Sequence, residues 1–211
     1  MVAELLNVNE VEDQSLSSNT YLFVDLETGG LAPERHSILQ LAAVLTDHDL
    51  KVQSHFMTYI RPHPDLAVTA EALAINQLRV EDLITAPDEA SVAQALSKFA
   101  HLALGKPRFA GFNCKFDLQF LTELWRRQGD IAPPYRVPWL DVLDVARLKP
   151  EFDDQLTNLK LATIAEHLGI DCAGAHDAAY DLLITIEVAK RLKAMPGRDG
   201  AVVLETARFS Q

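Results

Sequence analysis

A short apolar segment that ends in two acids constrains the fold most. Tyr21–Val24 is a continuous apolar run, which is typical of a central strand buried on both faces. Asp25 and Glu27 follow directly, before Gly29 and Gly30 open a loop. Side chains two residues apart on a strand point to the same face, so these two carboxylates form half of a cation site. Alone the pair is a weak signal, because an acid at a strand end is usually just solvated.

Apolar and helical periodicities divide the rest of the chain into further elements. Strands are expected at 38–46, 52–60, 108–112 and 137–140, and helices at about 69–75, 80–84, 89–104, 114–127, 141–148, 159–168 and 178–192. The polar turn at 47–49 is short, which implies that the strands beside it pair antiparallel. Asn113 is a candidate N-cap for the helix that follows it. Strands that alternate with helices later in the chain predict a layered α/β domain.

A length of 211 residues with 48% hydrophobic content fits one domain with a substantial core. We expect this domain at 20–193, after a polar lead-in at 1–19 and before a short tail at 194–211 that is either a loose terminus or a small strand or partner contact. No stretch approaches the roughly 20 apolar residues of a membrane helix, so a soluble, cytoplasmic protein is expected. Cys114 and Cys172 are too few for a disulfide framework and lack the spacing of a zinc site.

The net charge of −11 argues against a protein that coats duplex nucleic acid, because such binding needs many Lys or Arg contacts to phosphates. A nuclease that grips a few nucleotides at a strand end needs few of these contacts. Bound divalent cations would also supply positive charge that a residue count omits. The charge therefore disfavours a duplex-coating scaffold more than it disfavours a nuclease.

Two more acids occupy the apolar faces of predicted helices. Asp117 shares a face with Leu121 and Leu124, and Asp181 shares one with Val188. Burying an unpaired carboxylate is costly, so a cation, a cluster of donors or a helix N-terminus is expected beside each of them. For Asp117, a favourable contact with the helix dipole in the first turn is the alternative explanation.

The four acids and one histidine together suit phosphodiester hydrolysis. Asp25, Glu27, Asp117 and Asp181 can converge at the sheet edge and hold two Mg²⁺ or Mn²⁺ ions through oxygen ligands. His176 precedes Asp181 by five residues, about 140° away on a continuous helix, so we expect it in the preceding loop. From there an imidazole could take the proton of the attacking water, although a lone histidine is more often structural.

Three ordered motifs carry a resemblance to a known family. They are Val-Asp-Leu-Glu-Thr-Gly-Gly at 24–30, Gly-Phe-Asn-Cys-Lys-Phe-Asp at 111–117 and Ala-His-Asp-Ala-Ala-Tyr-Asp at 175–181, with a weaker match at 141–147. Together they resemble the DEDDh exonucleases, the family of the polymerase proofreading epsilon subunit, ribonuclease T and oligoribonuclease. The resemblance covers about 20–193. It implies an α/β, ribonuclease H-like exonuclease fold with a mixed five-stranded sheet flanked by helices.

The resemblance also implies a role for each of the five residues. Asp25, Glu27 and Asp181 would bind the first metal ion, and Asp25 would also hold the second. Asp117 would support the site directly or through water, and His176 would be the general base.

Further residues near the motifs are expected to contact substrate. They are Leu26, Thr28, Ile75, Asn76, Asn113 and Lys115. Epsilon-like relatives carry a His-Gly pair in the segment that touches the terminal nucleotide. In this chain the corresponding segment is Ala-Ile-Asn-Gln-Leu at 74–78, which contains Asn76. By position, Asn76 would bind a base or sugar, Leu26 and Ile75 would wedge against bases, and Lys115 would meet a phosphate. The alternatives are helix packing for the first three and simple solvation for Lys115.

The expected function is a metal-dependent 3′-to-5′ exonuclease that releases nucleoside monophosphates from single-stranded or frayed DNA ends. An RNA-trimming exoribonuclease of the same family and a catalytically idle nucleic-acid-binding accessory subunit are the alternatives. An endonuclease of related fold fits the motif order less well. The expected partners are a single-stranded nucleic acid 3′ end and, if the role is proofreading or repair, a polymerase or another replication or repair protein. The oligomeric state is left open.

Overall fold

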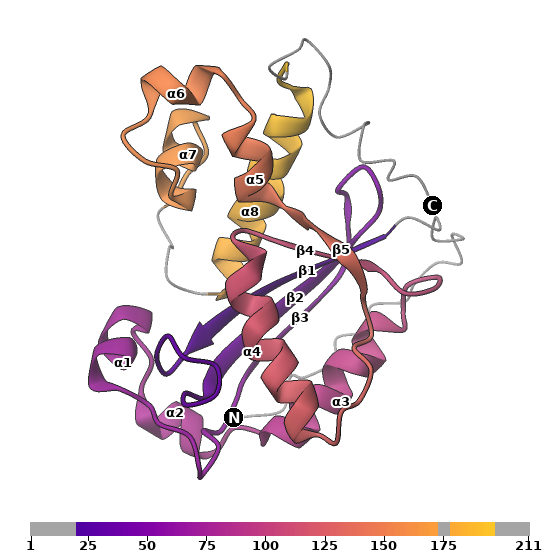
Figure 1. Ribbon diagram of the computed structural model, residues 1–211, viewed down its shortest axis with the longest axis vertical. Helices are drawn as coiled ribbons and strands as arrows, with labels where there is room; N and C mark the ends of the chain where they lie inside the picture. Colours follow the sequence, from indigo (N-terminus) through magenta and orange to yellow (C-terminus); the bar gives the residue numbers. More distant parts are fainter. Residues whose placement is uncertain (1–19, 173–177, 197–211) are drawn as a thin grey trace.

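The computed structural model describes residues 20–172 and 178–196. In this part of the chain a five-stranded sheet has the strand order β3-β2-β1-β4-β5 (Figure 1). Its strands are β1 (Tyr21–Thr28), β2 (Ile38–Thr46), β3 (Val52–Tyr59), β4 (Arg108–Gly111) and β5 (Arg136–Asp141). β1, β2 and β3 pair antiparallel, whereas β4 is parallel to β1 and β5 is parallel to β4. The predicted mixed five-stranded sheet is therefore confirmed.

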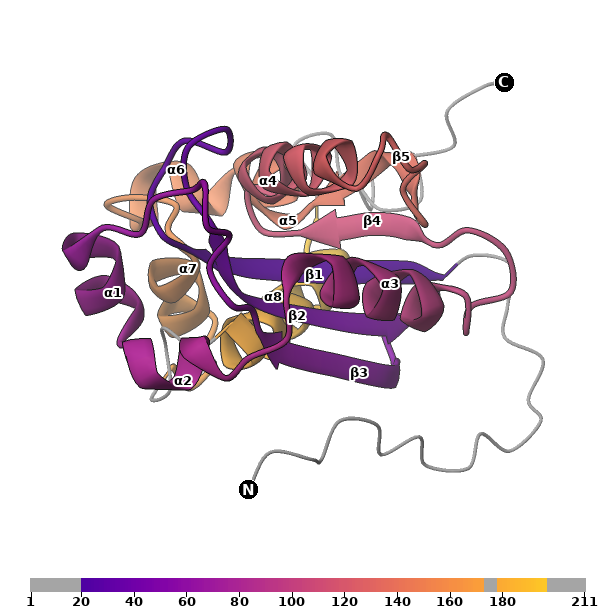
Figure 2. The same ribbon diagram turned by 90° about the horizontal axis from the view of Figure 1, so that it is seen from below.

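Helices cover both faces of this sheet. They are α1 (Ala70–Asn76), α2 (Val80–Ile84), α3 (Glu89–Ala100), α4 (Cys114–Arg127), α5 (Val142–Arg147), α6 (Glu151–Gln155), α7 (Leu161–His167) and α8 (Ala178–Ala194). Figure 2 shows α3 in front of the strands and α7 and α8 behind them. The described part thus has three layers, which agrees with the predicted layered α/β domain.

The central strand β1 is buried on both faces because its side chains alternate between two cores. Leu22, Val24 and Leu26 pack in one apolar cluster with residues of α3 and α4. Phe23 packs in a second cluster with residues of α5, α7 and α8. By the same alternation, Asp25 lies on the face of the sheet that α8 covers.

Side-chain caps fix the starts of α1 and α3. Asp88 accepts a hydrogen bond from the Ser91 backbone N–H at 2.8 Å and begins α3, whose first residue, Glu89, is the predicted one. Thr69 likewise accepts from the Ala72 N–H at 3.1 Å and begins α1. These bonds satisfy backbone donors that lack a partner within the helix.

Two helical predictions were wrong in detail. The helix expected to reach residue 104 ends at Ala100, because the later leucines leave the core: Leu102 is 42% exposed and Leu104 55%. The five-residue helix α6 was not predicted, since only Phe152 of its residues is buried and so short a segment shows no apolar periodicity.

Among the described residues, no helix is both long and apolar enough to cross a membrane. The boundaries proposed for the lead-in and the tail stay predictions, since residues 1–19 and 197–211 lie outside the described residues.

Candidate active site

Two carboxylates project from the end of the central strand. Asp25 and Glu27 are both half-buried, whereas their neighbours Val24, Leu26 and Thr28 are buried. The register between β1 and β2 shifts immediately after Glu27, where β1 turns into its loop. The two acids therefore lie at the end of regular pairing, on a strand held from both sides by apolar packing.

Helix α8 brings a third carboxylate to this point. Asp181 lies in the first turn of α8 and is half-buried, and one carboxylate oxygen from each of Asp25, Glu27 and Asp181 lies within 4.8 Å of the others. Gln40 of β2 sits opposite Glu27, and its Oε1 accepts a hydrogen bond from the Ala178 backbone N–H at 3.2 Å. This buried contact ties the start of α8 to the sheet beside the acids.

Asp117 approaches the same strand end from the layer of α4. Its side chain is buried, and burial raises its pKa well above the usual value. Hydrogen bonds from its own backbone N–H and from that of Leu26 act in the opposite direction, and the nearby charges of Asp141 and Glu27 raise the pKa further. A buried acid between other acids is the kind of group that a bound cation would stabilise in its ionised form.

Asp141 determines where α4 begins. Its carboxylate accepts hydrogen bonds from the backbone N–H groups of Asn113 and Cys114, both at 2.9 Å, and of Leu143 at 3.0 Å. Burial raises the pKa of Asp141, and these donors offset part of the effect. One carboxylate thus caps α4 and α5 together and sets the position of Asp117 in the first turn of α4.

The predicted capping role of Asn113 was wrong. Asn113 does precede α4, but its backbone is left-handed, with φ of 60°, and its side chain makes no capping hydrogen bond. A capping side chain normally extends from a residue in the β region, so this conformation directs the amide elsewhere. The side chain is exposed.

The residues expected to contact substrate fall into two groups. Leu26, Thr28 and Asn76 are buried, and the Asn76 Nδ2 donates a hydrogen bond to the Thr28 backbone oxygen at 3.0 Å. Ile75 is 57% exposed, and Lys115 and Asn113 are also exposed. The structure therefore ties α1 to the end of β1 through Asn76, the residue that the sequence analysis expected to bind a base or sugar. His176 lies outside the described residues.

The local sequence lets β4 approach the acids closely. A Cβ on Gly111 would lie 2.9 Å from the Val24 backbone oxygen, so any larger residue would push β4 away from the strand that carries Asp25. Gln40 and Asp141 were not predicted to have these positioning roles. A polar residue inside the apolar run 38–45 was the one signal that pointed to Gln40.

The donor set fits hard divalent cations. Asp25, Glu27 and Asp181 offer oxygen atoms within 4.8 Å of one another, with Asp117 beside Glu27. Oxygen-only ligands suit Mg²⁺ and Mn²⁺ rather than softer metals. Positive charge here would offset the mutual repulsion of the acids and create a centre that can bind the phosphate of a nucleic acid.

Comparison with known proteins places this geometry in a family. Residues 22–189 match the RNase_T family, which is described as exonuclease. A PolC-type DNA polymerase III of Oceanobacillus iheyensis is 32% identical over 171 residues, which cover 80% of this chain and 11% of that protein. Exodeoxyribonuclease I of Escherichia coli is 28% identical over 209 residues, covering 90% of this chain and 42% of that protein. The chain thus spans less than half the length of these relatives.

Solved structures of E. coli exonuclease I share the fold. Its complex with a dT13 oligonucleotide matches with a TM-score of 0.72 at 28% identity, covering 84% of this chain and 41% of that chain. The zinc-bound form of its complex with single-stranded DNA matches with a TM-score of 0.74 at 27% identity and the same coverage. The expected ribonuclease H-like fold is confirmed, and the chain belongs to the exonuclease family.

Proposed function

We propose that the protein is a 3′-to-5′ exonuclease of the DEDDh type that uses two divalent cations, Mg²⁺ or Mn²⁺, to release nucleoside monophosphates from single-stranded DNA ends. The observation that carries this proposal is the convergence of Asp25, Glu27 and Asp181 within 4.8 Å, in a chain of the exonuclease family. The relatives support DNA over RNA, because they are an exodeoxyribonuclease and a DNA polymerase.

Each acid has a distinct task in this proposal. Asp25, Glu27 and Asp181 hold the first cation, Asp25 also holds the second, and Asp117 supports the site from the α4 side. Bound divalent cations supply positive charge that stabilises the transferring phosphate and favours ionisation of the attacking water. The protein contributes a rigid frame, because Asp141 fixes the start of α4 and Gln40 fixes the start of α8.

His176 is proposed as the general base. It precedes the first residue of α8, Ala178, by two positions, so it is attached next to the helix end that carries Asp181. An imidazole ordinarily changes its charge near neutral pH and is suited to accepting a proton from water.

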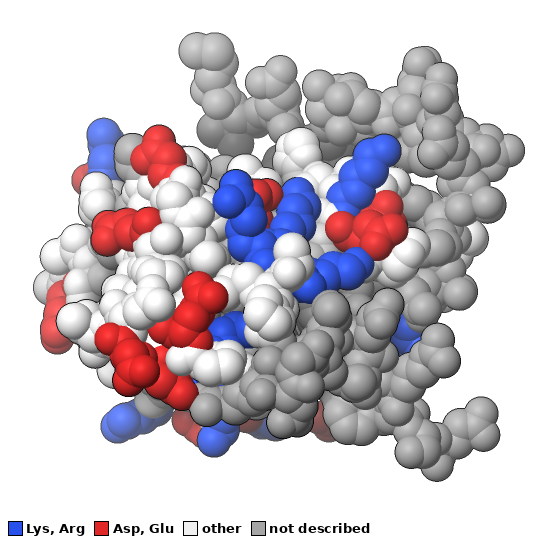
Figure 3. Space-filling view, turned by 90° about the horizontal axis from the view of Figure 1, so that it is seen from above, with Lys and Arg blue, Asp and Glu red and all other residues white. Residues whose placement is uncertain are grey.

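The substrate contacts follow the exposure of the predicted residues. Ile75, Asn113 and Lys115 are available to a nucleic-acid strand, whereas Leu26, Thr28 and Asn76 hold the strand end in place. The acidic excess of the chain is not spread evenly: Lys and Arg gather near the middle of the face seen in Figure 3. A polymerase or another replication or repair protein is the proposed partner, in view of the PolC relatives.

The test is digestion of 5′-labelled single-stranded DNA and RNA of the same sequence, with Mg²⁺, Mn²⁺ or EDTA. We expect a metal-dependent ladder that shortens from the 3′ end, faster on DNA. Asp25→Ala should abolish it and His176→Ala should weaken it strongly, whereas the exposed control Asp154→Asn on α6 should leave it unchanged.

Other outcomes would point to the alternatives. Faster digestion of RNA would indicate an exoribonuclease, and cleavage of circular single-stranded DNA would indicate an endonuclease. Binding of oligonucleotides without digestion under any metal would indicate an accessory subunit. Wild-type activity in Asp25→Ala, once contaminating nucleases are removed, would refute the assignment of the site.

A further inference from the structure

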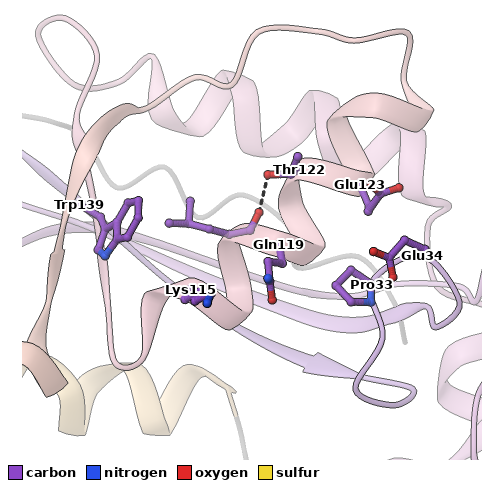
Figure 4. Close-up of a pocket in the computed structure, with 8 residues that line it drawn as sticks. Pro33, Glu34, Lys115, Gln119, Thr122, Glu123 and Trp139 are labelled. Atoms are coloured by element: carbon purple, nitrogen blue, oxygen red, sulfur yellow. Dashed lines mark hydrogen bonds between the residues drawn. The ribbon is translucent and has the colours of Figure 1, made fainter.

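A pocket of about 330 Å³ lies on the outer face of α4 (Figure 4). Lys115, Gln119 and Thr122 line it from α4, at a spacing that places them on one side of the helix. Trp139 of β5 and Glu34 of the loop after β1 complete its walls. The function proposed above uses Lys115 as a substrate contact but gives no role to the pocket itself or to Trp139.

The elements that form the pocket are those that flank the carboxylates. Lys115 is exposed and lies two residues before the buried Asp117, so one helix turn serves both the pocket and the acidic site. Glu34 lies in the loop that follows Glu27. Trp139 lies two residues before Asp141, the residue that caps α4. The pocket extends about 10 Å along α4, from Lys115 to Thr122, and its Lys115 end lies in the same helix turn as Asp117.

Trp139 gives the pocket an aromatic wall. It is 43% exposed on the edge strand β5, whereas the other tryptophan of the chain, Trp125, is 4% exposed. Large exposed aromatic side chains beside cationic ones are the elements with which proteins bind single-stranded nucleic acid, because every base offers a flat face for stacking.

The charges divide the pocket into two ends. Figure 4 shows Trp139 and Lys115 toward one side and Glu34 and Glu123 toward the other. The Glu123 carboxylate is paired with Arg126 at 2.8 Å, which offsets its charge. A phosphate would therefore pass at the Lys115 end, where the Gln119 amide can also donate a hydrogen bond.

We propose that this pocket is a subsite for a nucleotide upstream of the scissile bond of a single-stranded substrate. Its base stacks on Trp139 and its phosphate is bound by Lys115 and Gln119. This inference rests on the proposed exonuclease function and adds the element that holds the body of the strand while its 3′ end reacts. Stacking on one aromatic side chain predicts a loss of affinity of about 5-fold to 100-fold when that side chain is removed.

Tryptophan fluorescence tests the contact without requiring turnover. The chain contains two tryptophans, of which only Trp139 is exposed, so stacking of a base should quench the emission of Trp139. The titration uses a ten-nucleotide dT oligomer and the Asp25→Asn variant, which prevents digestion. Saturable quenching in this variant that is lost in the double variant Asp25→Asn, Trp139→Phe supports the subsite. Binding detected by anisotropy without any quenching refutes it.

Kinetics separate this inference from the proposed function. Trp139→Ala should raise the KM for the ten-nucleotide dT substrate about 10-fold and leave hydrolysis of the nitrophenyl ester of thymidine 5′-monophosphate unchanged, because the ester occupies only the acidic site. Val137→Ala is the matched control, since Val137 is exposed on the same strand but does not line the pocket.

An abasic nucleotide moved stepwise from the 3′ end locates the contact. At one position the abasic substrate should lose the sensitivity to Trp139→Ala that the intact strand shows. Equal sensitivity at every position, or an equal loss on the small ester, would overturn the subsite while leaving the exonuclease function intact. Absence of all hydrolysis by the wild-type protein would instead refute the proposed function.

Discussion

Replacement of Asn76 by alanine tests how α1 is attached to the active strand. The Asn76 side chain is 8% exposed, and its Nδ2 donates to the Thr28 oxygen at 3.0 Å on a residue that is itself 7% exposed. Asn76→Ala removes the donor and leaves a buried carbonyl without this bond, which costs about 1–3 kcal/mol. In a protein of this size, a loss of about 2 kcal/mol lowers Tm by about 4–8 °C.

Urea denaturation measures the loss, and the slope m should stay unchanged because the same surface is exposed on unfolding. Ile75→Ala is the control on the same helix. Its side chain is 57% exposed, so the change in stability should stay within about 0.5 kcal/mol. If Asn76 acts by holding the strand end, Asn76→Ala should lower kcat more than it raises KM. Wild-type stability combined with a raised KM alone would show instead that Asn76 contacts substrate.

Three further predictions concern buried and half-buried charged groups. The Nε of Arg127 donates a hydrogen bond to the buried Glu89 carboxylate at 2.9 Å. Arg127→Met leaves this carboxylate buried without that partner and should lower the free energy of unfolding by about 3–5 kcal/mol. The double variant with Glu89→Gln should recover much of the loss in urea denaturation. Burial raises the pKa of Asp117, so the folded state binds its proton more tightly than the unfolded state. In EDTA, stability should therefore fall as pH rises from the usual value of 3.8 through the raised pKa, and Asp117→Asn should flatten that part of the pH profile. Adding Mg²⁺ or Mn²⁺ should raise the Tm of the wild-type protein in calorimetry, and an equal rise in Asp25→Ala would mean that the cation binds elsewhere.

Local pattern was sufficient to place the elements that carry the acids. The largely apolar strand β2 and the amphipathic helix α4 both have the predicted bounds. β1 was predicted as a central strand, and its period of two put Asp25 and Glu27 on one face. The apolar stripe of α8 likewise placed Asp181 toward the sheet. In each case the burial of many side chains outweighs any single polar contact, so the pattern is reliable.

The contacts that orient the site could not be predicted in this way. Asp141 caps a helix that begins 27 residues earlier, and Gln40 holds the start of a helix 138 residues later. No local periodicity encodes a hydrogen bond between distant residues. The wrong prediction of a capping role for Asn113 has the same cause. Asparagine is a favoured N-cap residue, but here the Asp141 carboxylate at the end of β5 accepts the backbone hydrogen bonds at the start of α4.

The position of the acids at the end of β1 explains how the fold tolerates them. Two unit negative charges within 4.8 Å of each other repel by about 3 kcal/mol or more at an effective dielectric of about 20, and this site gathers three carboxylates with Asp117 buried beside them. Repulsion of this size could displace the end of an edge strand. The strand β1 instead lies between β2 and β4 and packs into an apolar core on each face. The packing that stabilises the sheet therefore also holds the carboxylates together. A cation that relieves their repulsion should for the same reason bind to a site that is already formed.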